Sequence, residues 1–360
     1  MYQHKRFITL MTICALAILA TAALLSLAGS GRGLTVQAAP ASPTVNTISS
    51  DTTWGPGVVT ITSDVVITNG ATLVVKPGTT VIVGTWAVPT DTAPYVGGVS
   101  DRVEIIVANG RLVADGYVTA TQLITPYQTI TFTNGTLGDP PWWGIRILHA
   151  SAAVSESIVS FARIEWGTYG ISIDNASPTV THNCITNMNG AWGSNGENGP
   201  AGTDGADGTA STNATDGTPG GDGSPGGNGS PAYGIYVTGA NSAPLIAHNE
   251  INDVTGGQGG WGGSGGKGGK GGDGYSPTDP NVGDGGDGAR GAAGGDGAPG
   301  GDGGDAAGIY VQDASPTIYH NTITKIRPGN AAWGGSGGNG GAGGKPFYPS
   351  FLRPPPALSG

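Results

Sequence analysis

Three histidines occupy the same position in a segment that occurs three times: His182, His248 and His320. If the segments stack as successive layers, the imidazole rings form a column with a spacing of about 4.8 Å, the distance between paired strands. Imidazole is a common ligand of transition metals, so this column is a candidate metal-binding face. The alternative is an exposed polar column beside a turn, because repetition alone places equal residues one above the next.

An asparagine follows each histidine, at Asn183, Asn249 and Asn321. In a stack of layers these side chains form a second, parallel column. A side-chain amide has both donors and an acceptor, so it can bond to its neighbours in the column and to nearby backbone. We therefore expect a structural role, in which the stacked amides satisfy the backbone of the turn.

A tryptophan follows each copy of the segment, at Trp192, Trp261 and Trp333. Indole rings combine a large apolar face with one polar group, so these residues are candidate carbohydrate contacts that stack on sugar rings. They can equally seal the base of the glycine-rich run that follows each of them. We favour sealing, because each tryptophan lies where such a run begins.

Acidic residues offer little catalytic chemistry. Glycoside hydrolysis needs two carboxylates at a fixed separation, and alignment of the copies places Asp174 beside Thr238 and Gln312 without an acidic cluster. The aspartates of recurring Gly-Asp-Gly triplets leave calcium open as a ligand, although calcium-binding repeats have a period of nine residues with an apolar position. These aspartates are Asp273, Asp287, Asp296 and Asp302.

The elements that must position these residues are short strands. Each copy begins with an alternating apolar run, as at Ile171 and Ile173, and has a second apolar run after a Pro-containing turn. A period of two indicates a strand with one buried face. A unit this small cannot bury its own apolar face, but a stack of such units can. The sequence therefore predicts that Ile171, Ile235 and Ile309 lie one above the next.

The pattern Gly-Ile-x-Val/Ile, Ser-Pro-Thr-Ile and His-Asn-x-Ile resembles the right-handed parallel β-helix proteins, both pectate-lyase-like and NosD-like. The resemblance covers about half of the chain after the N-terminal segment. It implies an all-β solenoid and makes copper the metal to consider at the histidine column. It also implies that a lyase would need an acidic calcium site near a basic residue. The fold itself carries many functions.

The first residues predict export. His4, Lys5 and Arg6 precede an apolar run, and residues 36–38 have the small-residue form of a cleavage site. We expect cleavage, with an uncleaved N-terminal membrane anchor as the alternative. Removing residues 1–38 takes away three basic residues and no acidic one, so the net charge of −10 becomes −13. A basic stripe for nucleic acid is therefore not expected. Cys184 is then the only cysteine and is expected at a half-exposed position.

The predicted organisation comprises eight segments. They are a signal peptide (1–38), a linker (39–54), a β-helix body of about five coils (55–192), a first glycine-rich insertion (193–231), a coil (232–255), a second insertion (256–307), a coil (308–333) and an incomplete third insertion or tail (334–360). The third insertion lacks a returning half, which predicts a truncated product or a fragment.

The insertions carry glycine at every third position on both sides of an aperiodic tip. One interpretation is an out-and-back hairpin of polyproline-II-type strands, on the order of 50–60 Å long at about 3.1 Å per residue. The other is a disordered linker, which the composition alone would favour.

The functional expectation is a secreted or cell-surface protein without enzymatic activity and without a cofactor, a β-helical scaffold for adhesion or contact with the envelope or matrix. The alternative is a β-helix that binds or degrades an extracellular polysaccharide. The expected partner is a polysaccharide or an envelope component, and a membrane is expected only through an uncleaved signal.

Overall fold

The computed structural model describes residues 47–83, 102–117, 130–135, 142–148, 156–275 and 287–346. The regular secondary structure of these residues consists of strands, with no helix among them. Within the same ranges no helix is long and apolar enough to cross a membrane. The predicted signal peptide (1–38) lies outside the described residues.

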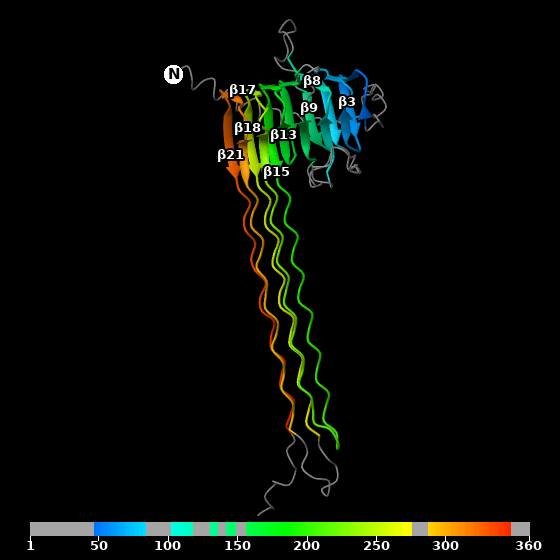
Figure 1. The fold of residues 1–360 in the computed structure, drawn as a ribbon, viewed down its shortest axis with the longest axis vertical. Coiled ribbons are helices and arrows are strands. Elements are labelled where there is room, and N and C mark those ends of the chain that lie inside the picture. The colour runs from blue at the N-terminus through cyan, green and yellow to red at the C-terminus, as the bar shows by residue number, and fades with distance from the viewer. Residues whose placement is uncertain are drawn as a thin grey trace, which may run out of the picture. The chain divides into compact units, whose positions relative to one another are not determined.

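The strands form three parallel sheets of seven strands each (Figure 1). The first sheet contains β1 (Thr47–Ile48), β4 (Val65–Ile67), β7 (Glu104–Val107), β10 (Gly144–Leu148), β13 (Tyr169–Asp174), β16 (Ala232–Thr238) and β19 (Ala306–Gln312). The second contains β2 (Thr52–Trp54), β5 (Thr72–Val75), β8 (Arg111–Asp115), β11 (Ile158–Ser160), β14 (Thr179–Thr181), β17 (Leu245–Ala247) and β20 (Thr317–Tyr319). The third contains β3 (Gly57–Ile61), β6 (Thr79–Val83), β9 (Ile130–Asn134), β12 (Ala162–Glu165), β15 (Cys184–Asn189), β18 (Glu250–Thr255) and β21 (Thr322–Arg327).

Each coil of the chain gives one strand to each sheet, so every third strand pairs with its equivalent in the next coil. This is the architecture of a parallel β-helix, and the right-handed form is the one that parallel crossovers strongly prefer. The predicted fold class is therefore confirmed. The body before the first glycine-rich insertion holds five coils, from β1 to β15, as the sequence predicts.

The core consists of columns of aliphatic side chains inside the coils. Ile145 pairs with Ile105 on one side and with Ile171 on the other, and all three are fully buried. The column continues through Ile235, which is also fully buried, in the neighbouring strand β16. Burial of one such side chain stabilises a fold by about 1.5–3 kcal/mol. No coil could gain this stabilisation without its neighbours.

Glycine fixes how closely the last three coils approach. A Cβ on Gly170 would lie 2.5 Å from the carbonyl oxygen of Gly234, and one on Gly234 would lie 2.6 Å from that of Gly308. The three glycines therefore form a column in β13, β16 and β19. The isoleucine after each glycine follows the same order, which confirms the predicted stacking of Ile171, Ile235 and Ile309.

The asparagine column is the ladder that the sequence predicts. Asn183 Nδ2 donates to Asn249 Oδ1 at 2.9 Å, and Asn249 Nδ2 donates to Asn321 Oδ1 at 2.9 Å. Each Oδ1 also accepts the backbone N–H of the asparagine in the preceding coil, at 3.0 and 2.9 Å. Further Nδ2 bonds reach Val159 and Val180 carbonyls. The ladder therefore satisfies the buried backbone of the turn between the second and third sheets.

Three predicted boundaries differ from the observed elements. Residues 39–54 were expected to be a linker, but β1 and β2 lie within them and form part of the first coil. The short, threonine-rich strands give little period-two signal, and pairing with β4 and β5 orders them instead. The glycine-rich segments also begin earlier than residues 193 and 334. Their backbone hydrogen bonds, which repeat every third residue, already start at Gly190 and Gly329.

The chain divides into two compact units. The coil unit comprises Met1–Asn187, Gly234–Asn252 and Gly308–Thr324, and the arm unit comprises Met188–Tyr233, Asp253–Ala307 and Lys325–Gly360. Within the coil unit, the core is open at the seventh coil. Ile318 and Ile323 are 43% and 44% exposed, whereas Ile246 and Ile251, their equivalents one coil earlier, are fully buried.

Candidate binding surface on the glycine-rich arms

The glycine-rich segments are extended and lie outside the β-strands. We number them as arm 1 (190–208), arm 2 (215–231), arm 3 (256–274), arm 4 (288–304) and arm 5 (328–345). Their backbone bonds run between arms and repeat every third residue. Gly193, Gly196 and Gly199 of arm 1, for example, donate to every third carbonyl of arm 3 at 2.7–2.8 Å. Three residues per turn with bonds only to neighbouring strands is the behaviour of polyproline-II-type helices.

The ordered interpretation of the insertions is therefore confirmed, and the disordered-linker interpretation is wrong for arms 1 to 5. Ordering a glycine costs more backbone entropy than ordering any other residue. Here, lateral hydrogen bonds to neighbouring arms offset that cost at every turn. Figure 1 shows the arms lying side by side over their length.

Arm 3 lies at the centre of the bundle. It accepts backbone bonds from arm 1 and arm 4, and it donates to arm 2 and arm 5. Two residues of each triplet therefore face a neighbouring backbone, and both are glycine. A Cβ on Gly262 would lie 2.0 Å from the Ala298 oxygen, and one on Gly263 would lie 1.8 Å from the Glu197 oxygen. The Gly-Gly-x pattern of arm 3 follows from having neighbours on several sides.

Asparagine and aspartate side chains lock the register between arms. Asn195 Oδ1 accepts the backbone N–H of Trp261 at 3.0 Å, and Asp204 Oδ1 accepts that of Lys270 at 2.7 Å. The same contact recurs on the other layer, where Asp222 Oδ1 accepts the N–H of Asp296 at 2.7 Å. These side-chain oxygens thus accept the backbone N–H groups of the non-glycine residues Trp261, Lys270 and Asp296.

Arms 1, 3 and 5 together present an outer face, built from the third residue of each triplet. Its rows follow from the backbone bonds, because Gly196 donates to Trp261 and Gly262 donates to Trp333. The first three rows are Trp192, Gln258 and Asn330; Asn195, Trp261 and Trp333; and Asn198, Ser264 and Ser336. Successive rows are about 9 Å apart, at about 3.1 Å per residue. We call these nine residues the neutral field, since none carries a charge.

The rows beyond the neutral field are charged. Lys270 Nζ donates to Asp273 Oδ1 at 2.8 Å, one turn further along arm 3. This hydrogen bond is the main cause that raises the pKa of Lys270 and lowers that of Asp273. Asp204 and Asp207 on arm 1 add to the positive shift of Lys270. The two side chains are 41% and 35% exposed, so solvent screens the pair.

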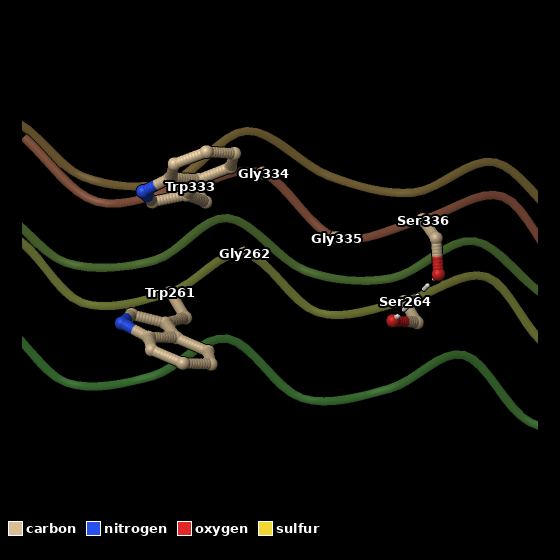
Figure 2. A pocket seen from close by; sticks show the side chains of 7 residues that line it. All are labelled: Trp261, Gly262, Ser264, Trp333, Gly334, Gly335 and Ser336. Atoms are coloured by element: carbon tan, nitrogen blue, oxygen red, sulfur yellow. Dashed lines mark hydrogen bonds between the residues drawn. The ribbon is translucent and has the colours of Figure 1, made fainter.

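Trp261 and Trp333 line a surface groove of about 440 Å³ in the neutral field (Figure 2). Ser264 and Ser336 stand beside it on the same two arms, with their hydroxyls 3.4 Å apart. Figure 2 shows the two indoles on neighbouring strands and the serine pair one turn along. The groove therefore combines two aromatic faces with two hydroxyls.

The three candidate tryptophans are not seals. Trp192, Trp261 and Trp333 are 76%, 68% and 84% exposed, so the favoured sealing interpretation is wrong. Trp261 and Trp333 share a row, whereas Trp192 lies one row before them. The three-residue glycine period already runs through the tryptophans, so it could have placed each of them at the third position of a triplet.

The histidine column forms as predicted, within the coil unit. The ring centroids of His182 and His248 are 4.8 Å apart, and those of His248 and His320 are 5.0 Å apart. Phe161 continues the column, with its ring centroid 4.6 Å from that of His182. It was not predicted, because it is not a histidine. All four residues have a positive φ of 50–56° at the turn between the second and third sheets.

Stacked rings favour the exposed polar column over a metal site. His182 and His248 lie nearly parallel, at 17°, so their in-plane nitrogen lone pairs do not converge on one point. Among the described residues no group of three or more histidine, cysteine or acidic side chains is placed to hold a metal ion. Burial, and secondarily the neighbouring His248, lowers the pKa of His182.

Ionisable groups on the coils are used in structural contacts. Arg146 Nη1 donates to Glu104 Oε2 at 3.3 Å, and Arg163 Nε donates to Glu165 Oε2 at 2.6 Å. Cys184 is half-buried, as expected, with Arg163 Nη1 at 3.9 Å from its sulfur. These pairs do not form the two-carboxylate arrangement that glycoside hydrolysis needs.

No protein-family model, curated protein or solved structure matches this chain. The parallel β-helix is thus established by the strand topology, and the pectate-lyase-like or NosD-like subtype rests on the sequence resemblance alone.

Proposed function

We propose that the protein is an exported, non-enzymatic scaffold that attaches to extracellular material through its glycine-rich arms. The supporting observation is the outer face of arms 1, 3 and 5. It is an ordered surface whose side chains repeat every third residue, as the backbone bonds require. A linker would need no such order, and ordering glycine is costly.

The surface suits contact with an extended target. Exposed aromatic residues in one region of a soluble protein commonly mark an interaction site. Two of the most exposed large hydrophobic side chains of the described residues, Trp261 and Trp333, line one groove there. The net charge of −10 makes nucleic acid and anionic lipid poor partners.

The experiment compares attachment of the full chain and of a Gly266→Val variant to insoluble cell-envelope and matrix preparations. A Cβ at Gly266 would lie 1.9 Å from the carbonyl oxygen of Pro200, so the variant disrupts arm packing. We expect the intact chain to sediment with the material and the variant to stay in solution. Equal sedimentation of both proteins contradicts attachment through the arms.

The degrading alternative is tested in the same samples. Release of reducing ends, or of the ultraviolet absorbance of an unsaturated uronate, would show turnover of polysaccharide. Turnover that is lost on replacing a single acidic residue of the coils would replace the scaffold proposal with an enzymatic one.

A further inference from the structure

We propose that the neutral field binds an uncharged polysaccharide, with the groove between Trp261 and Trp333 as its centre. This inference rests on the proposed attachment function and names the ligand class of the same surface.

The two indoles supply the apolar part of such a site. At 68% and 84% exposure, Trp261 and Trp333 leave most of their aromatic surface in water. Covering this surface with a ligand is favourable because it removes apolar area from water. A sugar ring presents a flat C–H face that can cover an indole, and the groove of about 440 Å³ is within the usual size of ligand sites.

The surrounding side chains are neutral hydrogen-bonding groups. Ser264 and Ser336 border the groove with hydroxyls that can both donate and accept. Asn195 and Asn198 use Oδ1 to accept the N–H groups of Trp261 and Ser264, so each carboxamide is held in place while its Nδ2 remains a donor. Amides and hydroxyls of fixed orientation complement the hydroxyls of a sugar chain. They supply no positive charge to pair with a carboxylate.

Charge selects against an acidic polysaccharide. The neutral field contains no basic residue, and the whole chain has a net charge of −10. A polyuronate would therefore meet repulsion from the net charge, with no cation among the nine residues of the field. Basic residues lie on either side of the field: Lys267 is one row beyond it on arm 3, and Arg327 is one row before it, immediately ahead of arm 5, where Nη1 contacts Asp253 Oδ1 at 3.3 Å. The uncharged class is thus favoured over the uronate class.

The rows also fit a long ligand. Three rows at about 9 Å spacing extend the field over on the order of 20 Å. Trp192 lies one row before the groove and is 76% exposed, so a further aromatic contact stands beside the central pair. A chain of several sugar units can contact the groove and Trp192 together, which a single monosaccharide cannot.

The test measures binding of the full chain to soluble polysaccharides by affinity electrophoresis. The neutral probes are mixed-linkage β-glucan, galactomannan and dextran, and the acidic probes are polygalacturonate and alginate. We expect retardation by at least one neutral probe and none by the acidic ones. Trp261→Ala and Trp333→Ala should each weaken that binding at least about 10-fold, whereas Lys267→Ala on the same arm should leave it unchanged. Because these three side chains are exposed, circular dichroism should show intact folds.

Several outcomes overturn the inference. They are failure of every neutral probe to bind, tighter binding of a polyuronate, and equal binding by the tryptophan variants. A change in mass by light scattering that depends on the tryptophans would also overturn it, because it would assign the groove to a second copy of the chain. Attachment to matrix through the arms without binding of neutral probes would refute this inference and leave the proposed function standing. Turnover of a probe would refute the proposed function, whatever the tryptophan variants do.

Discussion

Asn183 and Asn249 lie 66 residues apart in the sequence, yet Nδ2 of the first donates to Oδ1 of the second at 2.9 Å. Two of the glycine-rich arms are inserted between them. The ladder joins coils across an insertion whose loop closure has an entropic cost that grows only slowly with length. Long insertions between coils are therefore compatible with an unbroken ladder.

Replacing the central asparagine should destabilise the coils most. Asn249→Ala removes the bonds to Asn183, Val180 and Asn321, and it leaves buried backbone groups without partners. We expect a loss of at least about 3 kcal/mol in the free energy of unfolding. Asn321→Ala, at the end of the ladder, should cost about 1 kcal/mol. Urea denaturation of both variants measures the difference, and equal losses would contradict the ladder.

Two glycines in similar Gly-Gly-x triplets should respond oppositely to alanine. In arm 3, a Cβ at Gly263 would lie 1.8 Å from the Glu197 oxygen, whereas in arm 5 a Cβ at Gly340 would find its nearest atom at 3.6 Å. Gly263→Ala should cost at least about 2 kcal/mol through overpacking. Gly340→Ala should be neutral or stabilise by up to about 1 kcal/mol. Thermal melting followed by the polyproline-II circular dichroism signal separates them, and similar melting points would refute the packing account.

Asp222 tests whether the acidic triplets bind calcium or lock the register. Its Oδ1 accepts the N–H of Asp296 at 2.7 Å, a role that an asparagine keeps. Asp222→Asn should therefore retain the stability of the arms and also remove a negative charge near Asp296. Asp222→Ala should lower that stability by about 1 kcal/mol. Melting curves with calcium and with EDTA should coincide for the unchanged protein, and a calcium-dependent shift abolished by Asp222→Asn would support a metal site.

The stability of the coils should fall as the solution becomes acidic. Burial and the neighbouring His248 lower the pKa of His182 in the folded state. The unfolded chain, with a histidine pKa of about 6.5, then binds more protons than the folded chain. This contribution to stability is present above pH about 6.5 and is lost as the pH falls towards the lower, folded value. Urea denaturation between pH 5 and 8 measures the slope.

His182→Asn is the control for this pH dependence, since asparagine tolerates the φ of 55° at this position. We expect a shallower slope than in the unchanged protein. An identical slope would assign the effect to other groups.

Much of the architecture could be predicted because repetition makes it redundant. Ile171, Ile235 and Ile309 carry the same pattern, so three weak strand signals support one another. Features that occur only once could not be predicted in this way. Phe161 differs in type from the histidines with which it stacks, and its place at the turn depends on a φ of 50° that no residue preference indicates.

The arms could be predicted only in part. The three-residue period predicts a polyproline-II-type helix. The exposure of a side chain, however, depends on how many neighbours its arm has, and the local sequence does not show the order in which the arms lie side by side. Trp261 therefore could have been a seal or a surface residue by sequence alone. The order of arms around arm 3 decides between the two, because it turns every third residue outward.

The division of labour within each triplet has a consequence for how such a surface can change. In arm 3, glycine at the two inward positions is fixed by carbonyl oxygens about 2 Å from any added Cβ. The outward position meets no such constraint and takes residues as different as Trp261, Ser264 and Lys267. Single substitutions at the outward position can therefore change which ligand the face binds, while the hydrogen-bonded backbone of the arms stays the same.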